Sequence, residues 1–312
     1  MATITHVSSP ASGAVAVDAL IDTLLAAGWV ITRWSDATTY TDATGAPLSA
    51  NPYGSGGSGA GNLGNTSAWF TVRASDSSRE WLFQRGASDA AWTINRSKAG
   101  FVTGGTATVL PTATDATALF SAASAFTATP GRLFISADDA DGYGWRLMCI
   151  PSGGGNVLTL LADVPLDSPD PSDTDPYLWV GYYNATGLTV YSAMANGTTP
   201  GGSVLVYKRF AGAGSNQRVF FAGISGVAGA KYPESNSAGG LPSNQREVPL
   251  LVPVMREGAA ATSTGWCGYA RTMRWATLQG RANGQTLDGT TEYWIYAAGL
   301  WLRWDSSAPF LS

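Results

Sequence analysis

Apolar residues recur with helical spacing only near the start of the chain. The stripe consists of Val17, Leu20, Ile21, Leu24 and Leu25, which fall at positions i, i+3, i+4, i+7 and i+8. Ser12 or Gly13 can cap the start of this helix, and Gly28 can end it. A single helix of this length cannot bury its own stripe, so it must pack on the β body of the same chain or on a neighbouring subunit.

The rest of the chain has the period of strands. Segments 69–73, 79–85 and 91–96 are separated by turns, which predicts an antiparallel meander. Further short strands are expected at 29–34, 133–136, 143–150, 157–161, 177–183, 188–194, 204–210, 218–222, 250–255, 273–279, 292–297 and 300–304. Many short strands joined by Gly- and Pro-rich turns favour a mainly β fold, an antiparallel β-sandwich or jelly-roll-like body with one short N-terminal amphipathic helix.

Two segments follow from this pattern. Residues 1–34 hold an N-terminal arm, the helix and the first strand, and residues 35–312 form the β-sandwich body. The body can divide again into two sub-units near 195–215. The Gly-rich stretch from Gly59 to Gly64 matches GxGxxG, but polar coil precedes it and a strand follows it, so we expect a flexible loop rather than a dinucleotide site.

The composition indicates a surface that meets other proteins. Charged residues make up 13% of the chain, about half of the roughly 25% that is usual for soluble domains. Interface cores are depleted of charge and enriched in aromatic residues, and this chain has 12 Trp and 12 Tyr. The alternative is an ordinary β protein rich in Ser and Thr. The three lysines, Lys98, Lys208 and Lys231, are scattered, so we expect no nucleic-acid partner.

The distribution of apolar residues also bears on location. No run approaches the length that a membrane-spanning helix needs, so we expect no membrane span. The first ten residues carry no basic segment and the first apolar run is interrupted by Asp18 and Asp22, so we expect no signal peptide and synthesis in a cytoplasm.

Few residues suggest chemistry. His6 is the only histidine, so neither Ser-His-Asp nor Cys-His catalysis has a base, and no His-based metal site can form. Cys149 and Cys267 are expected to be buried free thiols, with a disulfide between them as the alternative. The Asp residues at 138–141 and 165–176 could bind Ca²⁺, but solvated turns favour Asp for its local hydrogen bonds. We therefore predict no catalytic, cofactor-binding or metal-binding residues.

Two carbohydrate functions stay open at this point. A glycoside hydrolase needs two carboxylates in a groove, and nothing in the sequence selects a pair from the five glutamates. Exposed Trp and Tyr rings could stack on sugars, although packing within sheets and interfaces is the favoured interpretation of these rings.

Several short motifs resemble uncharacterised virion structural proteins of tailed bacteriophages. They are Gly28-Trp29, Ser35–Tyr40, Trp69-Phe70, Arg79–Gly86, Trp92–Ile94, Gly100-Phe101, Pro111–Asp115 and Asp173–Tyr177. The resemblance implies a non-enzymatic subunit, present in many copies in a tail, baseplate, fibre or head surface. It assigns no functional residues.

We therefore expect a virion protein of the tail, baseplate or host-attachment apparatus, with a head-surface (capsid decoration) protein or a carbohydrate- or receptor-binding module as alternatives. Its expected partners are other virion proteins, further copies of itself in a trimer or ring, and a host surface glycan. The candidate interface residues are Val17, Leu20, Ile21, Leu24, Leu25, Tyr53, Tyr232, Trp301 and Trp304.

Overall fold

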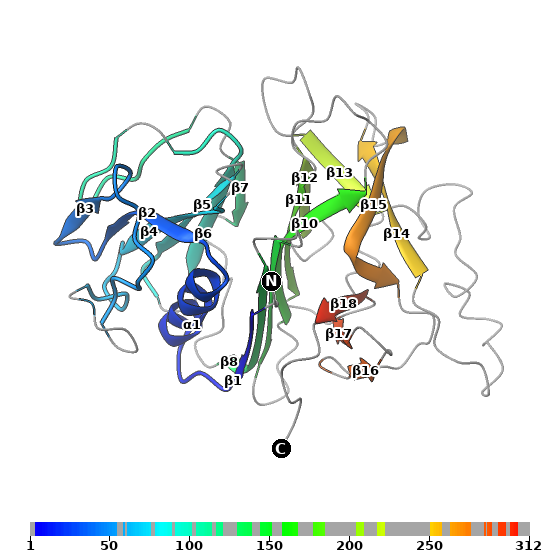
Figure 1. Ribbon diagram of the computed structural model, residues 1–312, viewed down its shortest axis with the longest axis horizontal. Helices are drawn as coiled ribbons and strands as arrows, with labels where there is room; N and C mark the ends of the chain where they lie inside the picture. Colours follow the sequence, from blue (N-terminus) through cyan, green and yellow to red (C-terminus); the bar gives the residue numbers. More distant parts are fainter. Residues whose placement is uncertain are drawn as a thin grey trace. The chain divides into compact units, whose positions relative to one another are not determined.

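The predicted helix is α1 (Gly13–Ala26) in the computed structural model of the chain (Figure 1). Ser12 is its N-cap, and the side-chain oxygen of Ser12 accepts a hydrogen bond from the Val15 N–H. Gly28 follows the helix with a φ of 96°, a left-handed conformation in which a glycine has no steric penalty. The sequence signals at both ends of the helix are confirmed.

The structure describes a defined part of the chain. The described residues are 4–54, 59, 61–75, 79–88, 91–101, 104–113, 117–120, 130–138, 144–151, 158–167, 177–184, 204–208, 217–221, 250–257, 263–275, 284, 286–288, 293–297 and 300–304.

The chain forms two compact units: unit 1 comprises Met1–Gly155 and Gly212–Asn216, and unit 2 comprises Asn156–Ala211 and Gln217–Ser312. Unit 1 therefore includes residues 1–34 together with the strands that follow, so the N-terminal helix and first strand are part of a β unit.

Unit 1 contains α1 and nine strands among its described residues. They are β1 (Ile4–Ser8), β2 (Val30–Ser35), β3 (Tyr40–Asp42), β4 (Trp69–Arg73), β5 (Glu80–Arg85), β6 (Trp92–Ser97), β7 (Thr117–Phe120), β8 (Pro130–Asp138) and β9 (Gly144–Pro151). One antiparallel sheet has the order β3-β2-β4-β5-β6-β7, and it includes the predicted meander. In addition, β8 pairs antiparallel with both β1 and β9.

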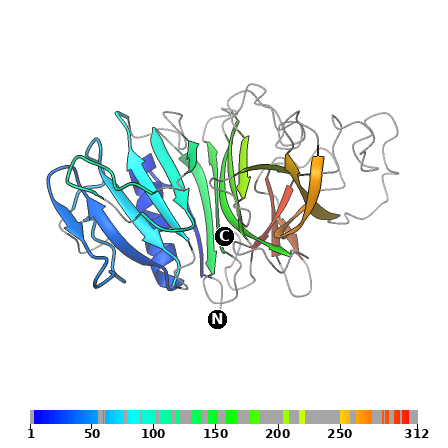
Figure 2. The same ribbon diagram turned by 90° about the horizontal axis from the view of Figure 1, so that it is seen from above.

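Aromatic side chains join these layers of unit 1. Trp81 and Phe83 of β5 contact Trp145 of β9, and the Trp81 and Trp145 rings meet edge to face with their centroids 4.8 Å apart. α1 packs against β8, β1 and β2 (Figure 2). The mainly β fold with antiparallel sheets and one N-terminal helix is confirmed for the described residues.

The packing of α1 corrects part of the interface prediction. Val17, Leu20, Ile21 and Leu24 are fully buried within unit 1, and Leu25 is half-buried. A side chain without accessible surface cannot contact a neighbouring subunit. Of the two expected packing partners, it is the β body of the same chain that covers the stripe.

Beside the apolar stripe, α1 carries a shared hydrogen bond. The side-chain amide of Asn51 donates to Asp18 and to Asp22, with 2.8 Å between Nδ2 and each Oδ1. Burial raises the pKa of Asp18; the Asn51 hydrogen bond lowers it, and the nearby Asp22 charge raises it again. The net effect is a raised pKa, so ionised Asp18 costs folded-state stability.

We expect Asp18→Asn to raise the melting temperature at pH 7, because the amide oxygen can still accept from Asn51 while the buried charge is removed. A carboxyl group with a raised pKa binds its proton more tightly in the folded state, so wild-type stability falls as pH rises through this pKa. The gain should therefore shrink as the pH is lowered towards 4. Thermal unfolding followed by circular dichroism at several pH values checks this. A lower melting temperature for Asp18→Asn at pH 7 would contradict it.

Unit 2 holds the remaining strands, β10 (Leu158–Asp167), β11 (Tyr177–Asn184), β12 (Val204–Lys208), β13 (Gln217–Phe221), β14 (Leu250–Glu257), β15 (Ser263–Trp275), β16 (Thr286–Asp288), β17 (Tyr293–Ala297) and β18 (Leu300–Trp304). Each strand from β10 to β15 pairs antiparallel with the next, and β15 pairs back with β10, so the six strands form a closed ring. β18, β17 and β16 extend the sheet from the other part of β15.

The long strand β15 explains how the ring and its extension coexist. Residues 269–270 of β15 pair with β10, whereas residues 273–275 pair with β18. Both partners lie along the edge of β15 that faces away from β14. The sequence predicted a strand only from residue 273 onwards, because glycines interrupt the alternation before it. The predicted strand at 188–194 lies outside the described residues. No helix in the described part of the chain has the length and apolar character to cross a membrane.

Candidate functional site

A polar pocket of about 260 Å³ opens in unit 1. Its lining consists of Thr32, Arg33, Thr44, Arg73, Arg79, Glu80, Ala99, Gly100 and Phe101. The inner side chains, including those of Arg33, Arg79 and Glu80, are buried, whereas Thr44 and Ala99 are exposed at the rim. Three guanidinium groups and one carboxylate therefore share a small space that opens to solvent.

An irregularity in β2 places two consecutive residues in this pocket. In a regular strand, neighbours point to opposite faces. Between β2 and β4, however, Ile31 pairs with Val72 and Arg33 with Thr71, so Thr32 is an extra residue in the ladder. Such a bulge redirects side chains, which explains why Thr32 and Arg33 both line the pocket.

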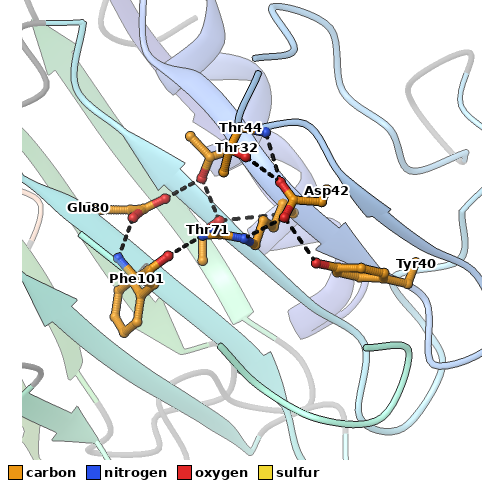
Figure 3. A network of polar contacts seen from close by, with 8 residues as sticks. Thr32, Tyr40, Asp42, Thr44, Thr71, Glu80 and Phe101 are labelled. Carbon is orange, nitrogen blue, oxygen red and sulfur yellow. Dashed lines mark hydrogen bonds and ion pairs between the residues drawn. The ribbon is translucent and has the colours of Figure 1, made fainter. Parts of the chain in front are cut away.

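Glu80 is the centre of a buried hydrogen-bond network (Figure 3). Its Oε2 accepts from the Phe101 N–H at 2.7 Å, and its Oε1 accepts from the Thr32 hydroxyl. The Thr32 hydroxyl has one hydrogen, so the Thr71 hydroxyl, 2.6 Å from it, donates to Thr32. Neutral donors thus hold this carboxylate and link β2, β4, β5 and the segment after β6.

Gly100 allows the chain to approach Glu80. Its φ of 88° lies in the left-handed region, and a Cβ at this position would lie 3.2 Å from Glu80 Oε2. Any larger residue would be strained in its backbone and crowded against the carboxylate. The glycine therefore positions the Phe101 N–H for its hydrogen bond to Glu80.

Arg33 joins the network to Asp42 on β3. Its Nη1 donates to the Phe101 carbonyl, and its Nε lies 3.3 Å from Asp42 Oδ2. Asp42 Oδ1 also accepts from the Thr44 amide and hydroxyl (Figure 3). The Thr44 side chain and amide, followed by the Arg33 charge, lower the pKa of Asp42, so this carboxylate stays ionised at neutral pH.

The remaining arginines complete the cationic side of the pocket. Arg79 is buried with its guanidinium 5.0 Å from the centre of the Trp29 ring, a cation–π contact. Arg73 ends β4 and is half-buried. Among the lining residues there is a single carboxylate, so the pocket has no pair of the kind that glycoside hydrolysis uses. The arrangement is suited to binding rather than to acid–base chemistry.

Tyr53, predicted as an interface residue, is also in the core of unit 1. Its ring meets Trp34 edge to face at 5.5 Å, and its hydroxyl lies 2.7 Å from the Trp69 carbonyl oxygen and 3.2 Å from that of Ser35. Burial raises the pKa of this phenol well above its ordinary value. Tyr53 is therefore not available to a neighbouring subunit.

The other predicted interface residues are not tested by these contacts. Tyr232 lies outside the described residues. Trp301 and Trp304 lie on β18 and pair with β17, but their side chains are not described.

Exposed apolar side chains occur instead on β14 and β15 of unit 2. Trp266 is 47% exposed and Leu251 is 45% exposed. The Trp266 and Tyr269 rings meet edge to face, with centroids 5.2 Å apart. Cys267, next to Trp266 in the chain, is buried, as predicted from the sequence.

A second bulge creates this aromatic pair. Trp266 and Tyr269 are three residues apart, so a regular strand would place them on opposite faces. Val254 pairs with Gly268 and Met255 with Trp266, so β15 has one extra residue between these pairs. Beside the rings, Arg271 forms an ion pair with Asp167 of β10, with 2.8 Å between Nη2 and Oδ1. We call the surface of Trp266, Tyr269, Arg271 and Asp167 the β15 face.

Both cysteines are free and buried. Burial raises the pKa of the Cys149 thiol to about 12. Because the thiolate is the reactive form, we expect Cys149 to resist Ellman's reagent at pH 8 in the native chain and to react after unfolding in guanidinium chloride. Two thiols per chain should be counted in the unfolded state without reductant. A count of zero would show a disulfide instead.

Metal binding finds no support in the described residues, where no group of three or more His, Cys, Asp or Glu side chains is placed to hold an ion. The Asp-rich segment 168–176 lies outside them.

A comparison of the chain with protein-family models and with curated proteins found no match in either.

Proposed function

We propose that this protein is a structural subunit of a tailed-bacteriophage particle, located in the tail, baseplate or host-attachment apparatus, and that it acts by assembling with other virion proteins. The proposal begins from the resemblance of the motifs between Gly28 and Tyr177 to phage virion proteins. The observation that carries it further is the exposed β15 face.

The β15 face has the composition of a protein interface. Trp, Tyr and Arg are the residues most enriched among those that dominate binding energy, and Trp266, Tyr269 and Arg271 lie together on one strand. Most large apolar side chains in the described residues are buried, so the exposed Trp266 is a departure from the rest of the described structure. Burial of such a group against a partner is favourable by about 25 cal/mol for each Å² of apolar surface removed from water.

We assign a second copy of this chain as the partner of the β15 face, in keeping with the expected trimer or ring. The face contains both members of the Arg271–Asp167 ion pair, so each copy carries a donor and an acceptor at the edge of its apolar centre. Its apolar centre and charged rim match the usual anatomy of an interface.

The assembly surface is tested by Trp266→Asp, with Val109→Asp as a matched control at another exposed apolar position. We expect the wild-type chain to be an oligomer by light scattering after size-exclusion chromatography. Trp266→Asp should weaken its self-association at least tenfold, because removal of a central interface Trp typically costs about 2 kcal/mol or more. Both variants should keep the wild-type circular dichroism spectrum.

Val109→Asp should retain the wild-type mass. If Trp266→Asp has the same mass as the wild type across the concentration range, the β15 face is not the contact between copies. The wider proposal has its own test: mass spectrometry of purified mature particles should find this chain in many copies, and its absence from them would reject a structural role.

A carbohydrate-binding module is the second candidate, and the same face provides the observation that favours it. Sugar rings pack their C–H faces on exposed aromatic rings, and charged side chains nearby hydrogen-bond the hydroxyl groups. Trp266 with the Arg271–Asp167 pair offers both. Binding on a glycan array by the wild type and loss of that binding in Trp266→Ala would support this function, whereas an array without signal would reject it.

A further inference from the structure

We propose that the pocket in unit 1 is a binding site for an oxyanion, a carboxylate or phosphate group carried by a small ligand, and that Arg73 is its principal contact. This site goes beyond the assembly role proposed above and does not depend on it, since the assembly face belongs to unit 2. The inference rests on the balance of charge in the pocket, on the state of Arg73 and on the size of the space.

The charges near the pocket do not balance within it. Three guanidinium groups line it, and Glu80 is the one carboxylate among the lining residues. Asp42, next to the pocket, neutralises Arg33. Among the described residues around the pocket, one cationic charge therefore remains in excess even when Asp42 is included. A partly buried cluster of this kind attracts anions, because positive potential is weakly screened where water is restricted.

Arg73 is the group with unused binding capacity. It stands opposite Glu80 in the ladder between β4 and β5. The oxygens of Glu80 nevertheless accept from Phe101 and Thr32, and Arg73 has no ion-pair partner in the described part of the chain. Its Nε is buried and makes no hydrogen bond there. A buried donor left without an acceptor destabilises the folded chain, and a bound oxyanion would supply the missing acceptor.

The other polar groups of the pocket are already engaged, which leaves recognition to the arginines. The Gly100 N–H donates to Ser97 Oγ, the Phe101 N–H to Glu80, and the Thr44 hydroxyl to Asp42. Guanidinium groups present paired N–H donors that match the two oxygens of a carboxylate or of a phosphate edge. The lining therefore selects for an oxyanion rather than for a neutral polar ligand.

The volume limits the ligand. Pockets that enclose drug-sized molecules typically measure about 300–1,000 Å³, and this one measures about 260 Å³. A single carboxylate or phosphate group with a few further atoms fits such a space. The exposed rim at Thr44 and Ala99 leaves the remainder of a larger ligand in solvent.

The test is a titration of the full chain with inorganic phosphate and, separately, with acetate, followed by isothermal calorimetry in buffer of low ionic strength. Sodium chloride at matched ionic strength is the reference. We expect at least one of the two anions to bind in the millimolar range or tighter. Arg73→Gln should weaken this binding at least tenfold, and Arg73→Lys should weaken it less, since it keeps the charge but loses the paired donors.

Arg132→Gln is the matched control, because Arg132 is a half-buried arginine of unit 1 that packs over the Phe134 ring and does not line the pocket. It should bind the anion like the wild type. To exclude an effect of misfolding, the arginine Nε–H resonances of the wild-type chain should be followed by NMR during the same titration, and the Arg73 signal should shift.

A preference for phosphate or for acetate identifies the group that the site takes. The proposal is overturned if neither anion binds more strongly than chloride, or if Arg73→Gln binds as tightly as the wild type.

Discussion

Leu20→Ala is expected to destabilise the folded chain by about 2–5 kcal/mol, the usual cost when a buried Leu is truncated and leaves a cavity. Leu20 has no accessible surface and lies on the side of α1 that packs into unit 1. Since small proteins are stable by only about 5–15 kcal/mol, this loss would be a large fraction of the total. Urea denaturation followed by circular dichroism measures it.

Val15→Ala is the control on the same helix, because Val15 is 42% exposed. It should change the free energy of unfolding by less than about 0.5 kcal/mol. The comparison separates a core role of the stripe from the subunit contact suggested by the sequence. If Leu20→Ala left the unfolding curve unchanged and reduced only the oligomeric mass, the stripe would be a contact between subunits after all.

Trp81→Ala is expected to cost about 3–5 kcal/mol, which is typical for the removal of a buried aromatic side chain. Trp81 is completely buried. Its ring meets the Trp145 ring edge to face with the two centroids 4.8 Å apart, and the centroid of the Phe83 ring lies 6.3 Å from its own. These contacts connect β5 to β9, so the substitution should loosen both layers of unit 1. Differential scanning calorimetry should show a lower melting temperature for the transition of this unit.

Two further substitutions sharpen this prediction. Trp81→Phe should cost much less than Trp81→Ala, because it keeps an aromatic ring and deletes an indole N–H that has no hydrogen-bond partner in the described residues. Trp266→Ala removes the same type of side chain from an exposed position and should leave the stability of the isolated chain almost unchanged. Equal losses for Trp81→Ala and Trp266→Ala would contradict the assignment of core and surface.

The elements that depend on local pattern could be predicted from the sequence. The apolar stripe of the helix, its N-cap Ser12 and the Gly28 that follows it all lie in one short continuous segment of the chain. The meander of β4, β5 and β6 and the hairpin of β17 and β18 alternate clearly and have turn residues between them. In each case the interactions that define the element join residues close in the chain.

The elements that depend on distant partners could not be predicted. β1 covers only residues 4–8, and its partner β8 comes more than a hundred residues later. The closure between β10 and β15 involves Leu166 with Ala270 and Asp167 with Tyr269, and no local pattern indicates such a pairing. The same holds for the division of the chain between Gly155 and Asn156.

The candidate sites were missed for a related reason, since both depend on bulges. The extra residue at Thr32 places it and Arg33 in the same pocket, and the extra residue in β15 brings Trp266 beside Tyr269. A one-residue shift changes the face on which a side chain lies, but the sequence does not reveal where such shifts occur. The number of Trp residues indicated a surface for contacts, and among the Trp side chains that the structure describes it is Trp266 that is exposed.

The most direct test of the proposed structural role is a cryo-electron microscopy reconstruction of the mature particle from the phage that encodes this chain. It should show both β units in several symmetry-related copies in the tail or baseplate, with Trp266 and Tyr269 buried against a neighbouring copy. A complete reconstruction that has no density for this chain would contradict the account.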